Sequence, residues 1–163
     1  LLMESALSGK GSLAECRKEC DSLISTRKGS SSDNRNWMAR AALMKSESYF
    51  HEKDYQSAQK VLSQHQETFQ GLSLEEDAAT YWKGACFAKM GQHGKALLEF
   101  EKIIEKNRRY AGPERFKNFD PRRSACKAAI QSCEAAGDSK KAKIYQGVLE
   151  REYPVELNKE GEK

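Results

Sequence analysis

Apolar positions along the chain recur at the three- and four-residue spacing of α-helices, and short polar turns interrupt them at four places. The four turns are GKGSLAE (9–15), KDYQSAQ (53–59), GQHGKAL (91–97) and GDSKKAK (137–143). Each has an alanine five residues after its first residue: Ala14, Ala58, Ala96 and Ala142. The pattern predicts a repeated unit of helix, turn and helix whose copies are 44, 38 and 46 residues apart, counted from positions 9, 53, 91 and 137.

The two helices of each predicted unit are expected to pack closely along a seam. A small or medium-sized residue lies near the middle of the first helix in the last three units, namely Ser46, Gly84 and Ile130. Antiparallel helices joined by a short turn approach closely, so a small residue at their crossing lets the backbones meet. The second helices carry apolar residues at helical spacing: Ala58, Val61 and Leu62; Ala96, Phe100, Ile103 and Ile104; Ala142, Tyr145 and Leu149.

This pattern resembles the tetratricopeptide repeat (TPR), most clearly in GACFAKMGQHGKALLEFEKI (84–103) and in KDYQSAQKVL (53–62). The shared features are a small residue, an aromatic three positions later, a glycine before the turn, an alanine after it and a closing proline, here Pro154. The resemblance implies an all-α fold, a right-handed superhelical solenoid of antiparallel helix-turn-helix repeats. Its domain is expected over 1–154, with repeats at 1–28 (truncated), 37–70, 76–108 and 121–154 and a frayed tail at 155–163. The spacings depart from the family's usual length of about 34 residues.

The long spacing and the ending EREYP (150–154) are similar to TPR proteins of the bacterial cell envelope, such as the Tol–Pal coordinator and barrel-assembly lipoproteins. This similarity implies a periplasmic or cell-envelope location. Free cysteines favour the cytoplasm as the alternative. The chain starts with Leu1 inside an expected helix, so we expect the biological chain to begin upstream.

The resemblance implies a non-enzymatic interaction scaffold that binds a protein or peptide on a concave face lined by the first helix of each repeat. The implied groove residues are Arg40, Leu43, Glu47 and Phe50; Tyr81, Ala85, Ala88 and Lys89; Ser124, Lys127, Gln131 and Glu134. We expect Tyr81, Phe50 and Arg40 to make the main contacts. Lys89 and Lys127 are expected to serve as charge anchors.

The net charge of +4 equals that of segment 105–123, which has seven basic and three acidic residues. Its distinctive cations are Arg108, Arg109, Arg115, Lys117, Arg122 and Arg123, interleaved with Tyr110, Phe116 and Phe119. Cations and aromatic rings together can bind nucleic acid, but we favour aromatics that pin a long loop while the cations stay solvated. The alternative functions are therefore binding of acidic partners or nucleic acid through this loop, or self-assembly into a homo-oligomer as a structural module of the cell envelope.

Local signals predict where the helices start and stop. Ser73 and Glu76 have the spacing of a capping box, and segments 29–36 and 107–123 are expected to be the long loops between repeats. Gly91 begins a turn that resembles the end of a phosphate-binding loop. A helix rather than a strand precedes it, and no Ser or Thr follows the lysine. We interpret Gly91 as a helix C-cap.

The composition and the reactive residues point away from chemistry. Charged residues make up 32% and apolar residues 38%, and no apolar run approaches the roughly 20 residues of a membrane helix. The five cysteines are odd in number and lack a CxxC pair, so we expect them to be buried thiols. His51, His65 and His93 fall at different places in the repeat. We predict no enzymatic activity, cofactor or metal, and structural roles for Trp37 and Trp82.

Overall fold

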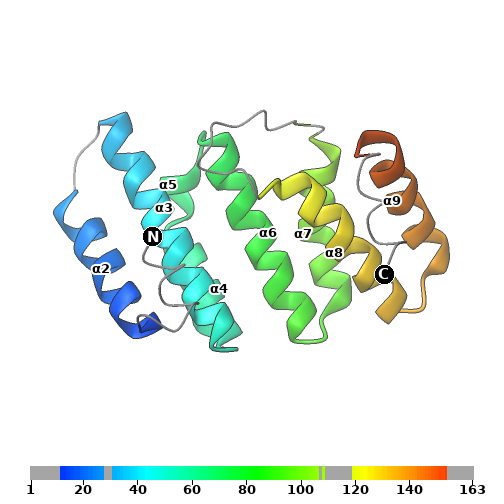
Figure 1. Ribbon diagram of the computed structural model, residues 1–163, viewed down its shortest axis with the longest axis horizontal. Helices are drawn as coiled ribbons and strands as arrows, with labels where there is room; N and C mark the ends of the chain where they lie inside the picture. Colours follow the sequence, from blue (N-terminus) through cyan, green and yellow to red (C-terminus); the bar gives the residue numbers. More distant parts are fainter. Residues whose placement is uncertain (1–11, 28–30, 107, 109–118, 154–163) are drawn as a thin grey trace, which may run out of the picture.

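The computed structural model describes residues 12–27, 31–106, 108 and 119–153. Within these ranges the chain is helical and contains no strand, which confirms the all-α prediction (Figure 1). The helices are α2 (Leu13–Thr26), α3 (Ser32–His51), α4 (Tyr55–Gln64), α5 (Gln66–Phe69), α6 (Ser73–Lys89), α7 (His93–Glu105), α8 (Pro121–Ala135) and α9 (Ser139–Glu152).

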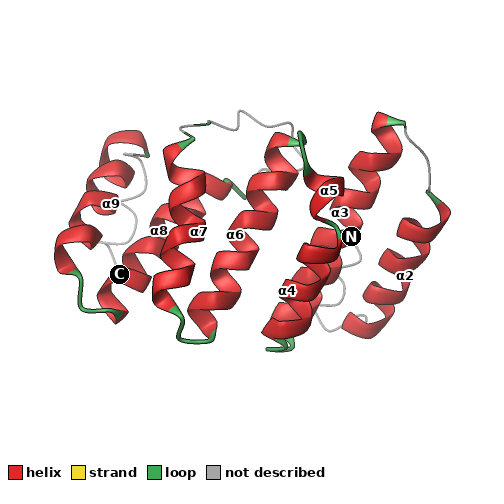
Figure 2. Cartoon of the chain, turned by 180° about the vertical axis from the view of Figure 1, so that it is seen from behind, coloured by secondary structure: helices red, strands yellow, loops and turns green. Residues whose placement is uncertain are grey.

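The helices lie side by side in a row that follows the chain order, from α2 at one end to α9 at the other (Figure 1). Three pairs are joined by short turns: α3 with α4, α6 with α7, and α8 with α9. The first helices of these pairs also touch each other, because α6 packs against both α3 and α8. Helices α3, α6 and α8 therefore form one layer, and the view from behind shows α4 and α7 on the other side (Figure 2).

The turns within the three pairs share one backbone conformation. Lys53, Gly91 and Gly137 each follow the end of the first helix with a positive φ of 64°, 73° and 76°. The next residue donates its N–H to a carbonyl five residues earlier: Asp54 to Tyr49 (3.0 Å), Gln92 to Phe87 (2.9 Å) and Asp138 to Cys133 (2.9 Å). This is the Schellman motif. It confirms the capping role predicted for Gly91, which follows the C-cap residue Met90 at the position that needs a positive φ.

The alanines after these three turns lie in the seam, as predicted. Ala58 and Ala96 are fully buried and Ala142 is 7% exposed. Ala14, at the matching position after the first of the four turns, is exposed in the first turn of α2. That helix instead buries Cys16 and Cys20 beside Ala41 of α3.

Small residues allow the close helix crossing in two of the pairs. A Cβ added to Gly84 would lie 2.5 Å from Cε1 of Phe100, so the ring occupies the place of a side chain on α6. Ser46 is buried, and its hydroxyl donates to the carbonyl of Ala58 at 3.1 Å. The third prediction was wrong, because Ile130 is half-buried and Ala129 is the fully buried residue.

Several predicted boundaries also differ. Residues 32–36 belong to α3 and not to a loop, because Ser31 accepts the N–H of Asn34 at 3.2 Å and starts the helix there. The capping box predicted at Ser73 is absent, since Leu72 occupies the N-cap position without a side-chain hydrogen bond. A capping box does form between Ser12 and Glu15. The predicted tail at 155–163 lies outside the described residues.

The turn geometry shared by the three pairs predicts opposite effects on stability for substitutions at the equivalent positions Lys53 and Gly91. Lys53→Gly should stabilise the fold by about 1 kcal/mol, because an L-residue with a side chain is strained at positive φ. Gly91→Ala should cost about the same, since its added Cβ meets no atom within 4 Å and only backbone strain changes. Urea unfolding followed by circular dichroism measures both. Equal stability of Lys53→Gly and the unmodified protein would contradict the assignment.

The close contact at Gly84 predicts that the same glycine-to-alanine change has opposite effects on stability at two helical positions. Gly84→Ala should cost about 2 kcal/mol because the methyl group collides with the Phe100 ring. The matched control is Gly147→Ala in α9, where the added Cβ has free space. That change should stabilise by up to about 1 kcal/mol through helix propensity. Thermal unfolding of the two variants should therefore shift in opposite directions.

Candidate functional site

Four aromatic side chains gather on the layer of α3, α6 and α8. Trp82 of α6 is the centre of this group, with ring centroids 5.0 Å from Phe50, 5.4 Å from Tyr81 and 6.4 Å from Phe119. Phe119, just before α8, also lies 5.3 Å from Tyr81. All four are half-buried. Edge-to-face and stacked contacts of this kind hold the rings in defined positions, and each ring remains partly accessible.

A hollow of about 400 Å³ lies between α6 and α8 beside this aromatic group. We call it the alanine hollow, because Ala85, Ala88 and Ala128 line it where larger side chains would fill the space. Lys89 and Gln131 add polar groups. Small residues of neighbouring helices thus create a recess with aromatic walls.

A second hollow of about 330 Å³ lies between α3 and α6. We call it the Trp82 pocket; it is lined by Arg40, Leu43, Met44, Glu47, Ala78, Trp82 and Phe119. Trp82 lines both hollows, so they are neighbours on one face of the molecule.

Most of the residues predicted to line a groove do come together on this face. Arg40, Leu43 and Glu47 line the Trp82 pocket. Phe50, Tyr81, Lys89 and Gln131 line the alanine hollow. Lys127 is exposed and lines neither hollow.

Trp82 and Phe119 were missed as groove residues. The sequence does contain a signal for Trp82, since residues 78, 82, 85 and 89 have the spacing of one helical face. Phe119 precedes its helix, so no periodicity could place it. Trp37, expected to anchor the start of a helix, lies in the second turn of α3, where the residue is 47% exposed and the guanidinium groups of Arg27 and Arg40 lie 5.4 and 5.8 Å from its ring centroid.

The charges of the Trp82 pocket are unequally compensated. Arg40 Nε lies 3.2 Å from Oε1 of Glu75, whose side chain is 8% exposed. Burial raises the pKa of Glu47, and His51, whose Nε2 lies 3.7 Å from Oε1, acts in the opposite direction. Burial and the nearby Glu47 also raise the pKa of Tyr81. Glu47 is thus a carboxylate that the fold partly removes from water.

The predicted basic loop is only partly described, and part of it is not a loop. Arg109, Arg115 and Lys117 lie outside the described residues. Arg122 and Arg123 belong to the first turn of α8, where the carboxylate of Asp120 accepts both of their backbone N–H groups.

Arg122 is not a solvated cation, which corrects the prediction for this residue. It is 4% exposed, its Nε donates to the carbonyl of Ile104 at 3.1 Å, and its guanidinium makes a two-bond ion pair with Glu152. The side chain therefore joins the start of α8 to the ends of α7 and α9.

A comparable ion pair lies near the start of α6. The buried carboxylate of Asp77 lies 2.6 Å from Nζ of Lys106 and 3.9 Å from the guanidinium group of Arg108. Phe119 does pack onto α6, as predicted for the loop aromatics.

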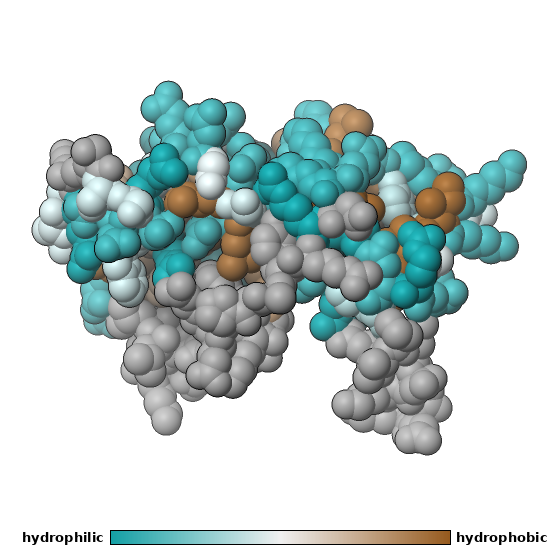
Figure 3. All heavy atoms as spheres, turned by 90° about the horizontal axis from the view of Figure 1, so that it is seen from above, coloured by the Kyte–Doolittle hydropathy of each residue, from teal (hydrophilic) through white to brown (hydrophobic). Residues whose placement is uncertain are grey.

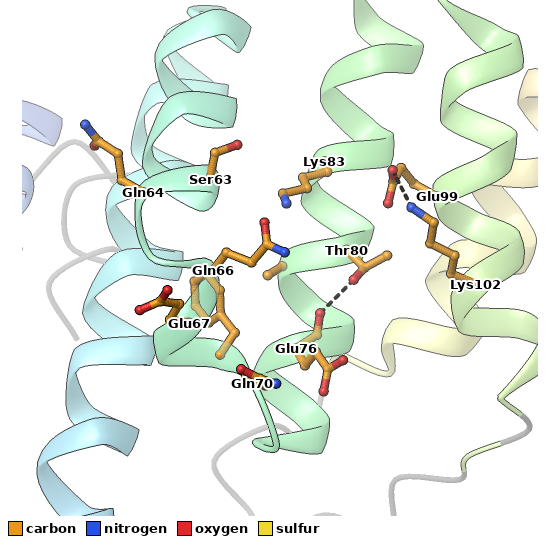
Figure 4. Close-up of a pocket in the computed structure, with 12 residues that line it drawn as sticks. Ser63, Gln64, Gln66, Glu67, Gln70, Glu76, Thr80, Lys83, Glu99 and Lys102 are labelled. Atoms are coloured by element: carbon orange, nitrogen blue, oxygen red, sulfur yellow. Dashed lines mark hydrogen bonds and ion pairs between the residues drawn. The ribbon is translucent and has the colours of Figure 1, made fainter. Parts of the chain in front are cut away.

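A larger hollow of about 770 Å³ lies on another side, between α4 and α5 and the pair α6 and α7 (Figure 4). Its lining is mostly polar, with Gln66, Gln70, Thr80 and Lys83 around it. Binding sites usually combine an apolar surface with a few polar groups. The view from above in Figure 3 shows a mainly hydrophilic surface with hydrophobic residues in small separate patches. The aromatic face is the better candidate site.

Arg122 acts as a clamp between the start of α8 and the ends of α7 and α9. Replacing it should therefore reduce stability much more than replacing Arg151, which contacts the same carboxylate. Arg122→Met should cost about 3 kcal/mol, because it leaves the buried Glu152 without its partner. Arg151→Met is the matched control, since Arg151 is 72% exposed and reaches Glu152 at 3.5 Å, and it should cost less than about 1 kcal/mol. Chemical denaturation measures both. Equal losses would show that Arg122 is not a structural clamp.

The described part of the chain contains no helix with the length and apolar character that a membrane crossing requires. Among the same residues, no group of three or more His, Cys, Asp or Glu side chains is placed to hold a metal ion. No family model matches the chain, and the comparisons with curated proteins and with solved structures likewise return no match.

Proposed function

We propose that this chain is a non-enzymatic scaffold that binds a segment of a protein partner on the face of α3, α6 and α8. We further propose that its helix pairs form a TPR-like right-handed solenoid. The repeated Schellman turns at Lys53, Gly91 and Gly137 support this architecture, because each pair reverses the chain direction through the same backbone conformation.

The observation that carries the functional proposal is the pair of neighbouring hollows on either side of Trp82. An extended or helical peptide presents side chains on one face at regular intervals, and two adjacent recesses suit two such side chains. Trp and Tyr are the residue types that contribute most to binding energy at protein interfaces. Both types occur here, at Trp82 and Tyr81.

The site is also preformed. Tyr81 packs against Phe100, at 5.9 Å between centroids, and Trp82 packs against Phe50 and Phe119. Side chains held in this way lose little conformational freedom on binding, which favours affinity. A rigid apolar surface with polar groups at its edge therefore suits recognition by shape and charge.

The alternative hypotheses receive less support. Binding of acidic partners or nucleic acid through segment 105–123 cannot use Arg122, which is buried in its ion pair. One expectation for the main proposal also changes: Arg40 was expected to contact a partner directly, but its guanidinium group forms an ion pair with Glu75. Self-assembly stays a prediction, and no contact within the described residues favours it over partner binding.

The proposal predicts that a side chain placed in the alanine hollow blocks binding. The probe is a set of peptides selected from a displayed random-peptide library on the unmodified chain. Ala128→Glu should weaken their binding at least about tenfold, because the new carboxylate fills the recess and opposes burial. Titration by fluorescence anisotropy measures the affinity.

The matched control is Ala14→Glu, the same change at an exposed position of α2. It should leave peptide affinity unchanged, and both variants should keep the helical circular dichroism spectrum. Undiminished binding to Ala128→Glu, or a selection that yields no peptide sensitive to this change, would overturn the proposal.

A further inference from the structure

The Trp82 pocket combines two nearly parallel rings with one carboxylate. The Trp82 and Phe119 rings make an angle of 12° at a centroid distance of 6.4 Å. Leu43 and Ala78 add apolar surface, and Glu47 of α3 adds its carboxylate. The volume of about 330 Å³ has room for one long side chain.

Formal charges at this pocket leave one negative charge. The positive charge of Arg40 is matched by the carboxylate of Glu75 at 3.2 Å, so these two cancel. Glu47 has His51 as its ion-pair partner among the described residues, at 3.7 Å and only when the imidazole is protonated. A neutral His51 therefore leaves the partly buried Glu47 charge uncompensated, and burial raises its pKa.

Three kinds of side chain could enter the pocket, and the surroundings favour one of them. A carboxylate would face Glu47 and the electron-rich faces of the rings, and both repel it. An apolar side chain would remove more water from Glu47 without replacing its hydrogen bonds, which is unfavourable. A cation is attracted by the carboxylate and by the face of an indole ring together.

We propose that the Trp82 pocket is a subsite for a basic side chain of the partner, lysine or arginine, held between the Glu47 carboxylate and the Trp82 ring. This inference rests on the proposed function, since it names the chemistry of one residue in the bound segment.

The test uses small probes that enter the pocket without a full partner. N-acetyl-arginine methylamide carries the charge, and N-acetyl-citrulline methylamide has nearly the same shape without it. Titration followed by the two indole N–H signals in the NMR spectrum separates the pocket from the rest of the surface. The Trp82 signal should shift with the arginine probe at about threefold to tenfold higher affinity than with citrulline. Trp37 is an internal control, because Arg27 and Arg40 already flank its ring and repel a further cation.

Two matched substitutions identify the carboxylate. Glu47→Gln should reduce the affinity for the arginine probe to that of citrulline. Glu19→Gln, at an exposed position of α2, should leave it unchanged. Since burial disfavours the ionised form of Glu47, its neutral replacement should not lower the melting temperature at pH 7, so loss of binding cannot be attributed to unfolding.

Equal affinities for the two probes, or an unchanged preference in Glu47→Gln, would overturn the inference. These results are distinguishable from failure of the proposed function. Selected peptides that depend on Ala128 while the pocket shows no preference for arginine would leave the scaffold proposal standing and remove the cation subsite. An arginine preference together with peptides insensitive to Ala128→Glu would keep the pocket chemistry and reject the proposed peptide-binding face.

Discussion

The close contact between Phe100 and the backbone at Gly84 is the constraint on which this arrangement depends. The ring is fully buried and lies where a side chain of α6 would otherwise project, so α7 can approach α6 at this point. The same ring is 5.9 Å from Tyr81 and lines the alanine hollow. One side chain therefore joins the packing of a helix pair to the geometry of the candidate site.

Ion pairs complete the design where the apolar seam ends. Asp77 with Lys106 and Arg122 with Glu152 each connect the start of a first helix to the end of the second helix in its pair. Burying charges is costly unless they are paired and hydrogen-bonded. These pairs therefore specify which helix ends meet, and they use cations that the composition would assign to the surface.

The candidate site follows from what the seam leaves uncovered. Because α4 and α7 pack behind α3, α6 and α8, the opposite face of this layer is without a helix in the described structure. Alanines on that face lower the surface between the helices, and the rings around Trp82 form its walls. We propose that this surface binds a partner segment and that Glu47 adds a charge preference within it.

The sequence by itself determined the helical class, the turns and the seam alanines of three pairs, because helical periodicity and C-cap chemistry are local properties. The resemblance to the tetratricopeptide repeat also indicated most of the groove residues, and Leu43 and Phe50, seven positions apart, share one face of α3. Only the tertiary structure decided that Arg122 is an internal clamp, that Phe119 joins Trp82, and that Glu75 neutralises Arg40. These outcomes depend on contacts between residues far apart in the sequence. Arg122 and Ile104 are 18 positions apart, Arg40 and Glu75 are 35 apart, and Trp82 and Phe119 are 37 apart. No local pattern encodes such contacts, because they arise only when the helices pack.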